Sequence, residues 1–272
     1  MNQYSENELA FFKQLLLEYD VRVDGRKKME KRKYKIEYDI INNCFSSLKL
    51  TYNNSKSEMI FAIKGELLKE EEQTEDSNYS DKIVVSINSM AYKTSQSEEY
   101  KTTKNKMEYL INNLIVSKIS TDSLFIDGSS QKMSWKLYLD IFIFDELRMS
   151  LFQLISIGVK KILENVKVPK LKVFQNEIEN NIEYDLKTNY EDIKYEDSEE
   201  KIKLDIPNVY SFAILNNFLY LDPSDEELMI TSCSLYLNEK NKKILNVESI
   251  GDSVDPVLYS QLSNIINNLQ EE

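Results

Sequence analysis

The clearest pattern of hydrophobic and polar positions lies in the middle of the chain, at residues 135–144. Every second residue there is aliphatic, and the residues between are aromatic or polar. A period of two, rich in β-branched and aromatic residues, is typical of a strand. We therefore predict a central strand with one fully buried face and a second face that is largely buried. The first face consists of Leu137, Leu139, Ile141 and Ile143.

A core helix is predicted directly after this strand, because the apolar residues recur at intervals of three and four beyond Arg148. Lys160 and Lys161 fall in its last turns, where cations favour the negative end of the helix dipole. Pro169 lies just beyond, where it cannot continue the helix. A strand that leads into a core helix is typical of an α/β or α+β domain.

The N-terminal part predicts one helix, a tight turn and an antiparallel meander. Ser5 and Glu8 form a capping-box pattern at the start of an amphipathic helix over residues 5–19. Asp24 and Gly25 then predict the tight turn. Asparagines, which tolerate the left-handed conformations of hairpin turns, separate three strand-like runs at residues 34–41, 47–52 and 58–68.

Four further segments lie between the meander and the central strand. Residues 69–81 have the composition of an exposed loop, and residues 82–92 predict a fourth strand. Residues 97–119 predict a long helix with an apolar stripe, and residues 124–126 a short strand.

The C-terminal part repeats this order of strands and helices. An acidic excursion with weak periodicity comes first, at residues 175–202. Strand-like runs follow at residues 208–215, 216–221, 230–237 and 243–250, the second of them opening with a hairpin turn at Asn216-Asn217, and an amphipathic helix closes the chain at 254–269. We therefore predict a duplicated α+β unit. The first domain covers residues 1–168, with the leading helix, and the second covers residues 169–272, with the acidic insertion near 175–202.

A cluster of carboxylates lies between the second and third of these strand-like runs. Asp222 is predicted to cap a helix, with Pro223 as its first residue and Asp225, Glu226 and Glu227 in its first turn. The same carboxylates could form a metal or acid/base cluster. A capping turn, or a surface that docks a neighbour, is the favoured interpretation.

Composition excludes several kinds of chemistry. The 272-residue chain has no histidine, which excludes His-based triads and most zinc sites, and its five glycines form no phosphate-binding motif. Cys44 and Cys233 lack metal-ligand spacing and are interpreted as core residues. We predict no cofactor and no metal. No apolar run is long enough to span a membrane and the polar start is no signal peptide, so we expect an intracellular protein without a membrane partner.

At this point the motifs resemble the RNase PH family, in particular the RNase PH-like subunits of the eukaryotic exosome core ring. Four segments carry the resemblance in order: VRVDGR (21–26) followed by Arg32, WKLYLD (135–140), ISIGVKKIL (155–163) and NNFLYLDPSDEE (216–227). The resemblance extends from about residue 8 to 268 and is poor over 175–202. It implies the RNase PH-like (ribosomal protein S5 domain 2-like) fold. Three subunits of that ring are inert. The combination of RVDGR with a Leu-Asp-Pro-(x)3-Glu turn resembles one of these three more than the other two.

Three departures from the family's pattern imply an inert subunit rather than an enzyme. Lysines 101 and 104 stand where the family has an arginine pair before the long helix. Residues 145–148, with two acids and no glycine, replace its glycine-rich phosphate loop. Ser234 stands where the family has a catalytic aspartate.

The resemblance implies a non-catalytic exosome subunit located in the nucleus (nucleolus) and cytoplasm. Its implied partners are other RNase PH-like subunits, as a heterodimer within a six-membered ring, S1/KH cap subunits, and RNA in the ring channel. An active phosphate-dependent 3′→5′ exoribonuclease is the alternative, with Lys101, Lys104 and a carboxylate near Asp222 as replacements. A free-standing acidic adaptor that folds as a monomer is a third possibility.

The net charge of −12 argues against a dedicated nucleic-acid-binding protein, yet residues 26–35 are strongly basic. For Arg22, Asp24 and Arg26, an ion-paired turn that holds the N-terminal helix and the neighbouring subunit is favoured over an RNA contact. The basic cluster up to Lys35 is the better RNA candidate. The candidate RNA or subunit contacts are Arg22, Arg26, Lys28, Arg32 and Lys33.

Overall fold

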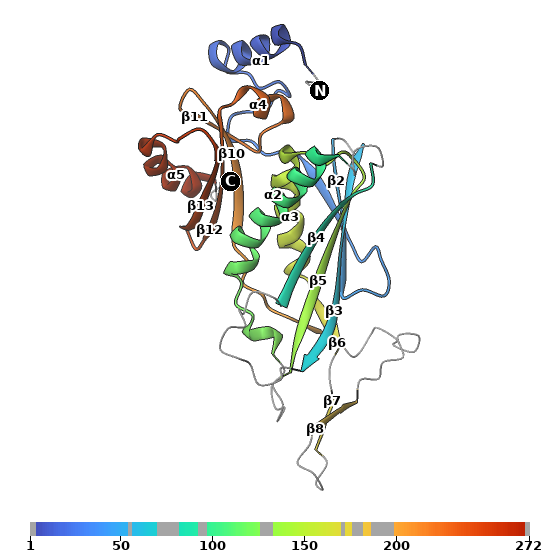
Figure 1. Cartoon of the computed structure of the whole chain (residues 1–272). Coiled ribbons are helices and arrows are strands. Elements are labelled where there is room, and N and C mark those ends of the chain that lie inside the picture. The colour runs from blue at the N-terminus through green and yellow to red at the C-terminus, as the bar shows by residue number, and fades with distance from the viewer. Residues whose placement is uncertain are drawn as a thin grey trace.

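The chain folds into two sheets with helices between them, as seen in the computed structural model (Figure 1). Two central helices lie between a five-stranded and a four-stranded sheet, and the C-terminal helix covers the outer side of the smaller sheet. This arrangement is the predicted α+β class. The structure describes residues 4–53, 56–69, 82–91, 97–125, 133–169, 172–175, 182–185 and 199–269.

The five-stranded sheet has the order β1-β2-β3-β5-β4, with β4 parallel to β5 and all other pairs antiparallel. The predicted meander and fourth strand are confirmed. Leu137, Leu139, Ile141 and Ile143 are completely buried, as predicted, whereas the opposite face of β5 is only half-buried because no described helix covers it. The prediction of a largely buried second face was wrong. The strands are β1 (Tyr34–Tyr38), β2 (Ser46–Tyr52), β3 (Ser57–Lys69), β4 (Ile83–Ser89) and β5 (Met133–Ile143).

The two central helices are α2 (Glu98–Leu114) and α3 (Phe152–Leu163). Both were predicted, and α3 packs closely on the sheet because Gly158 faces the ring of Phe61, which leaves no space for a side chain there. The short strand predicted at residues 124–126 was wrong. Asp122–Leu124 forms a turn of 3₁₀ helix, Phe125 makes a single bridge, and residue 126 lies outside the described residues.

The four-stranded sheet has the antiparallel order β11-β10-β12-β13. Asn216 and Asn217 both adopt positive φ (47° and 63°) in the predicted hairpin turn. Helix α5 (Pro256–Leu269) packs on the face away from α2 and α3. The strands are β10 (Asn208–Leu215), β11 (Phe218–Leu221), β12 (Cys233–Lys240) and β13 (Lys243–Gly251).

Four short strands connect the two units. β6 (Lys167–Pro169) pairs with β9 (Glu199–Lys201), and β7 (Lys172–Gln175) pairs with β8 (Ile182–Asp185). Most of the predicted acidic excursion, residues 176–181 and 186–198, lies outside the described residues, as do residues 70–81 of the predicted loop.

The leading helix packs on the second unit and not on the first. Helix α1 (Glu6–Glu18) begins with the predicted capping box, and its Leu16 is buried against Leu215 and Tyr220. It lies beside α4 (Asp225–Ile230) at one end of the molecule (Figure 1). Its placement in a first domain of residues 1–168 is therefore corrected, because its apolar partners come from β10 and β11. None of the described helices is long and apolar enough to cross a membrane.

Candidate functional site

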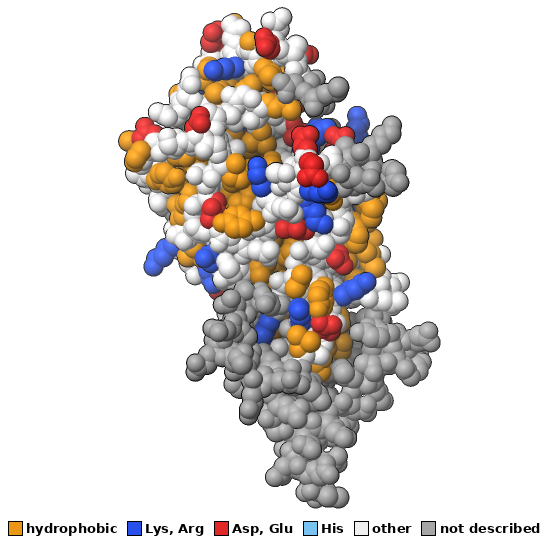
Figure 2. Space-filling view, in the orientation of Figure 1, with side chains coloured by type: hydrophobic (Ala, Val, Ile, Leu, Met, Phe, Trp, Pro, Cys, Tyr) orange, Lys and Arg blue, Asp and Glu red, His pale blue; other side chains and the backbone are white. Residues whose placement is uncertain are grey.

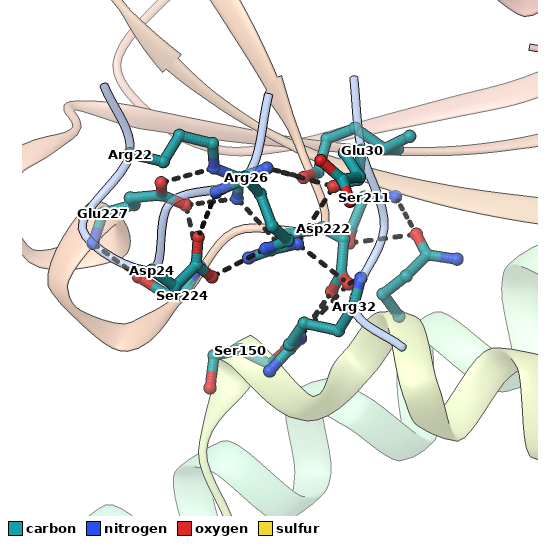
Figure 3. Close-up of polar contacts among 12 residues, drawn as sticks. Arg22, Asp24, Arg26, Glu30, Arg32, Ser150, Ser211, Asp222, Ser224 and Glu227 are labelled. Carbon is teal, nitrogen blue, oxygen red and sulfur yellow. Dashed lines mark hydrogen bonds and ion pairs between the residues drawn. The ribbon is translucent and has the colours of Figure 1, made fainter. Parts of the chain in front are cut away.

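A network of arginines and carboxylates joins the N-terminal segment to the turn before α4 (Figure 3). Arg22 is 1% exposed, and its guanidinium donates to both carboxylate oxygens of Glu227, at 2.7 and 2.6 Å. The same guanidinium also donates to the carbonyls of Leu221 and Asp222. Gly25, at φ +78°, makes the predicted tight turn and brings the segment back towards Arg22.

Glu227 is held by the cap of α4. The hydroxyl of Ser224 accepts a hydrogen bond from the Glu227 N–H, and the Glu227 carboxylate accepts one from the Ser224 N–H. Ser224 is thus the N-cap, and the prediction of Asp222 as the cap was wrong. Pro223 accordingly lies outside the helix.

Asp222 instead holds two arginines of the N-terminal segment. Its carboxylate accepts hydrogen bonds from the backbone N–H and the Nε of Arg32, at 2.7 and 3.1 Å, and from Nη1 of Arg26 at 3.3 Å. Its backbone has φ +52°, and its N–H donates to the carbonyl of Ser211 on β10. The side chain is 1% exposed, so water does not compete for these contacts.

Two arginines carry the network across to the first unit. Nη2 of Arg32 donates to the Ser150 carbonyl just before α3. Arg148, in the loop after β5, binds Asp225 at 2.9 Å and Glu146 at 2.7 Å. Neither link can be predicted from the order of the residues, because each joins residues far apart in the chain that only the fold brings together.

The charges of the network support one another. Burial alone would lower the pKa of Arg32, but its hydrogen bonds to Asp222 hold that pKa above the usual range. Burial alone would raise the pKa of Asp24, but Arg26 holds it below the usual range. Burial and the proximity of Arg22 lower the pKa of Arg26.

The arrangement holds separate segments of the chain together. Asp222 and Glu227 use their oxygens on arginines and backbone N–H groups, and they have almost no access to solvent. Within the described part of the chain, no three potential ligands cluster in a way that could hold a metal ion. The predicted capping turn is therefore present with Ser224 in place of Asp222 as the cap, and the alternative of a surface that docks a neighbour stays a prediction.

The five predicted RNA or subunit contacts differ in exposure. Arg22 is buried and unavailable to any partner, so its candidacy as a surface contact is corrected. The side chains of Arg26 and Arg32 are only 9% and 14% exposed and bind Asp222. Lys28 lies at the surface, with its ammonium 2.8 Å from Asp20 and 4.3 Å from the ring centroid of Phe218, and Lys33 is exposed.

The positions that match the family's phosphate pocket hold no open anion site in the described residues. Lys101 and Lys104 pair with Glu98 and Glu108 along the surface of α2. At residues 145–148, the Asp145 carboxylate accepts a hydrogen bond from the Tyr52 hydroxyl at 2.8 Å, and Arg148 is bound to Glu146 and Asp225. Ser234 lies within β12, paired with Ala213 and Ile250.

Known structures confirm the fold over almost the whole chain. A chain described as an archaeal exosome core matches with a TM-score of 0.62 at 17% identity, covering 97% of this chain and 96% of the other. A chain of the Archaeoglobus fulgidus exosome with RNA bound to the active site matches with a TM-score of 0.65 at 18% identity, covering 98% of each. Rice (Oryza sativa) Rrp46 matches with a TM-score of 0.55 at 10% identity, covering 92% and 95%.

Sequence comparison gives a weaker match of the same kind. The putative exosome complex exonuclease RRP42 of Dictyostelium discoideum is 26% identical over 158 residues, which is 55% of this chain and 44% of that relative. The match thus spans less than half the length of this curated relative. No family model matches the chain. The predicted resemblance to RNase PH-like exosome core subunits, and the predicted fold class, are confirmed.

Proposed function

We propose that this chain is a non-catalytic RNase PH-like subunit of an exosome core ring. The full-length similarity in fold to exosome core chains carries this proposal. The chain would form a heterodimer with another RNase PH-like subunit, complete a six-membered ring of such subunits, contact S1/KH cap subunits, and help to guide RNA through the channel. Its working locations would be the nucleus, with the nucleolus, and the cytoplasm.

The carboxylates around the matching positions support the non-catalytic assignment. Phosphorolysis needs a phosphate held by cations or helix N–H groups beside the scissile bond. Here the nearby Arg32 and Arg148 are already bound to carboxylates, and the stretch that matches the phosphate loop carries Asp145 and Glu146. An entering phosphate would have to displace Asp222 or Asp225 from these arginines.

Among ring subunits, we place the chain nearest to RRP42. The curated relative bears that name. The two sequence motifs that favour this subunit, RVDGR and the Leu-Asp-Pro-(x)3-Glu turn, supply Arg22 and Glu227, which bind each other. This ion pair gives a structural reason for both motifs to be present in one chain.

Affinity purification of the tagged full-length chain from its own cells tests the ring assignment. We expect near-stoichiometric recovery of other RNase PH-like chains together with S1/KH-type RNA-binding chains. Recovery of the chain alone would support a free-standing adaptor instead and would overturn the ring assignment.

A phosphorolysis assay on the purified chain tests the non-catalytic assignment. The chain is incubated with single-stranded RNA and inorganic phosphate, with an active archaeal exosome core as the positive control. We expect no phosphate-dependent release of nucleoside diphosphates. Release that disappears in a Lys101→Ala/Lys104→Ala variant would establish the alternative, an active exoribonuclease.

A further inference from the structure

Two lysines from distant parts of the sequence meet beside β10. The ammonium of Lys160, on α3, donates to the side-chain oxygen of Asn208. The ammonium of Lys31, in the N-terminal segment, lies 4.7 Å from the ring centroid of Tyr210. Asn208 and Tyr210 are two residues apart on one strand, so they lie on the same face and bring the two ammonium groups close together.

The two lysines have too few carboxylates around them. No carboxylate of the described residues lies within ion-pair distance of Lys31, and the nearby Asp222 is engaged by Arg26 and Arg32. Glu164 is shared between Lys160, at 3.7 Å, and Lys161, at 3.0 Å. Burial lowers the pKa of Lys31, the charge of Asp222 opposes this shift, and the proximity of Lys160 adds to it. An incoming anionic group would relieve the repulsion between the two ammonium groups.

Two exposed aromatic rings on the edge strand β1 lie near Lys161, which follows Lys160 on α3. Tyr34 and Tyr38 are 41% and 43% exposed. Their cross-strand partners Tyr52 and Leu48 are buried in the core, so both tyrosines lie on the face of the sheet that α3 covers. Both also come close enough to Lys161 to contribute to its raised pKa, although Glu164 is the main cause.

We propose that Lys31, Lys160, Lys161, Tyr34 and Tyr38 form a binding surface for single-stranded RNA, here called the lysine–tyrosine surface. The lysines would bind backbone phosphates and the two rings would stack on bases. Tyrosine is enriched and lysine depleted in protein–protein interfaces, so the three lysines, and not the two rings, favour RNA over a protein partner. The choice of RNA as the ligand rests on the proposed function.

Fluorescence anisotropy with a labelled short single-stranded oligoadenylate tests this surface on the full chain. We expect Lys31→Gln/Lys160→Gln to weaken binding and to reduce the slope of log K against log salt by about 1.4, or about 0.7 for each lost phosphate contact. We expect Tyr34→Ala/Tyr38→Ala to weaken binding by at least about tenfold with little change in that slope. Lys242→Gln/Lys243→Gln, in the exposed turn between β12 and β13, is the matched control and should bind like the wild type.

Several outcomes would contradict the assignment. Equal binding by the wild type and the lysine variant, or equal loss in the control, would overturn it. Competition by inorganic phosphate far beyond that of chloride at equal ionic strength would assign a free phosphate ion instead of RNA. Loss of ring partners in affinity purification with unchanged RNA binding would assign the surface to a neighbouring subunit. Because recovery of ring partners by the wild type is measured separately, failure of the ring assignment is distinguishable from failure of this surface.

Discussion

Arg22 and Glu227 are 205 positions apart in the chain, yet each is the other's charge partner in an interior almost closed to water. Buried ion pairs of this kind gain little net stability against an apolar replacement of both partners, but removing one partner leaves the other charge uncompensated. The N-terminal segment therefore docks stably only when both partners of this pair are present. A position that looks like a surface arginine in the sequence is part of the interior.

We predict that Arg22→Met lowers the free energy of unfolding by about 3–5 kcal/mol, because Glu227 then remains buried without its cation. Urea denaturation followed by circular dichroism measures this change. Lys35→Met removes an exposed ion pair with Glu37 and is the control, with an unchanged midpoint expected. The double variant Arg22→Met/Glu227→Met should recover much of the loss. A single variant as stable as the wild type would show that the buried pair is unimportant.

The sequence predicts several of the residues that belong to this network, but it does not predict which residues they bind. The ion-paired turn of Arg22, Asp24 and Arg26 was favoured from its composition. Its cap was assigned to Asp222 because the Asp-Pro pattern resembles a helix start, whereas Ser224 satisfies the N–H of Glu227. The positive φ of Asp222 and its pairing with Arg32 depend on the course of the N-terminal segment across the second unit, which no local pattern records.

Among the elements, α3 depends most on close packing. An added Cβ at Gly158 would lie 2.2 Å from the ring of Phe61, which is itself completely buried on β3. In an exposed helix, replacing glycine by alanine stabilises by up to about 1 kcal/mol. Here the overlap dominates, because inserting a methyl group into a packed core costs about 1–3 kcal/mol.

We therefore predict that Gly158→Ala lowers the thermal unfolding midpoint although it improves helix propensity. The free energy of unfolding should fall by up to about 2 kcal/mol, the difference between the two effects. Differential scanning calorimetry measures the midpoint. Adding Phe61→Leu to Gly158→Ala should restore part of the loss by removing the ring that the methyl group meets. A Gly158→Ala variant more stable than the wild type would contradict the close approach of α3 to β3.

Elements with a strong period could be predicted from the sequence, and weakly patterned ones could not. The alternation of β5 and the capping box of α1 are local signals, and both elements lie where they were expected. The packing of α1 on the second unit could not be predicted, because an apolar stripe does not specify which surface covers it. The same holds for residues 124–126, where a short apolar run fits a strand or a 3₁₀ turn equally well.

At the scale of the whole molecule, the two units share one hydrophobic core. Tyr236 of β12 stacks edge-on against Phe152 of α3, with ring centroids 5.0 Å apart, and Val209 of β10 belongs to the same buried cluster as the first sheet. Gln153 of α3 adds a polar link. Its amide donates to the Val209 carbonyl at 2.9 Å and accepts from the Ser211 N–H at 2.7 Å.

This shared core predicts a single cooperative unfolding transition. Trp135 is the only tryptophan and is 6% exposed in the first unit, so its fluorescence reports on that unit, whereas far-ultraviolet circular dichroism reports on the whole chain. In urea the two signals should change together for the wild type.

Gln153→Leu leaves a buried N–H and a buried carbonyl of β10 unpaired, which costs about 1–3 kcal/mol for each group. We expect this variant to be destabilised and its two transitions to separate, because the lost bonds are those that tie β10 to α3. Gln14→Leu, at an exposed glutamine of α1, is the matched control and should keep a single transition. Separate transitions in the wild type would show that each unit folds independently, and coincident ones in Gln153→Leu would show that apolar packing alone couples the two units.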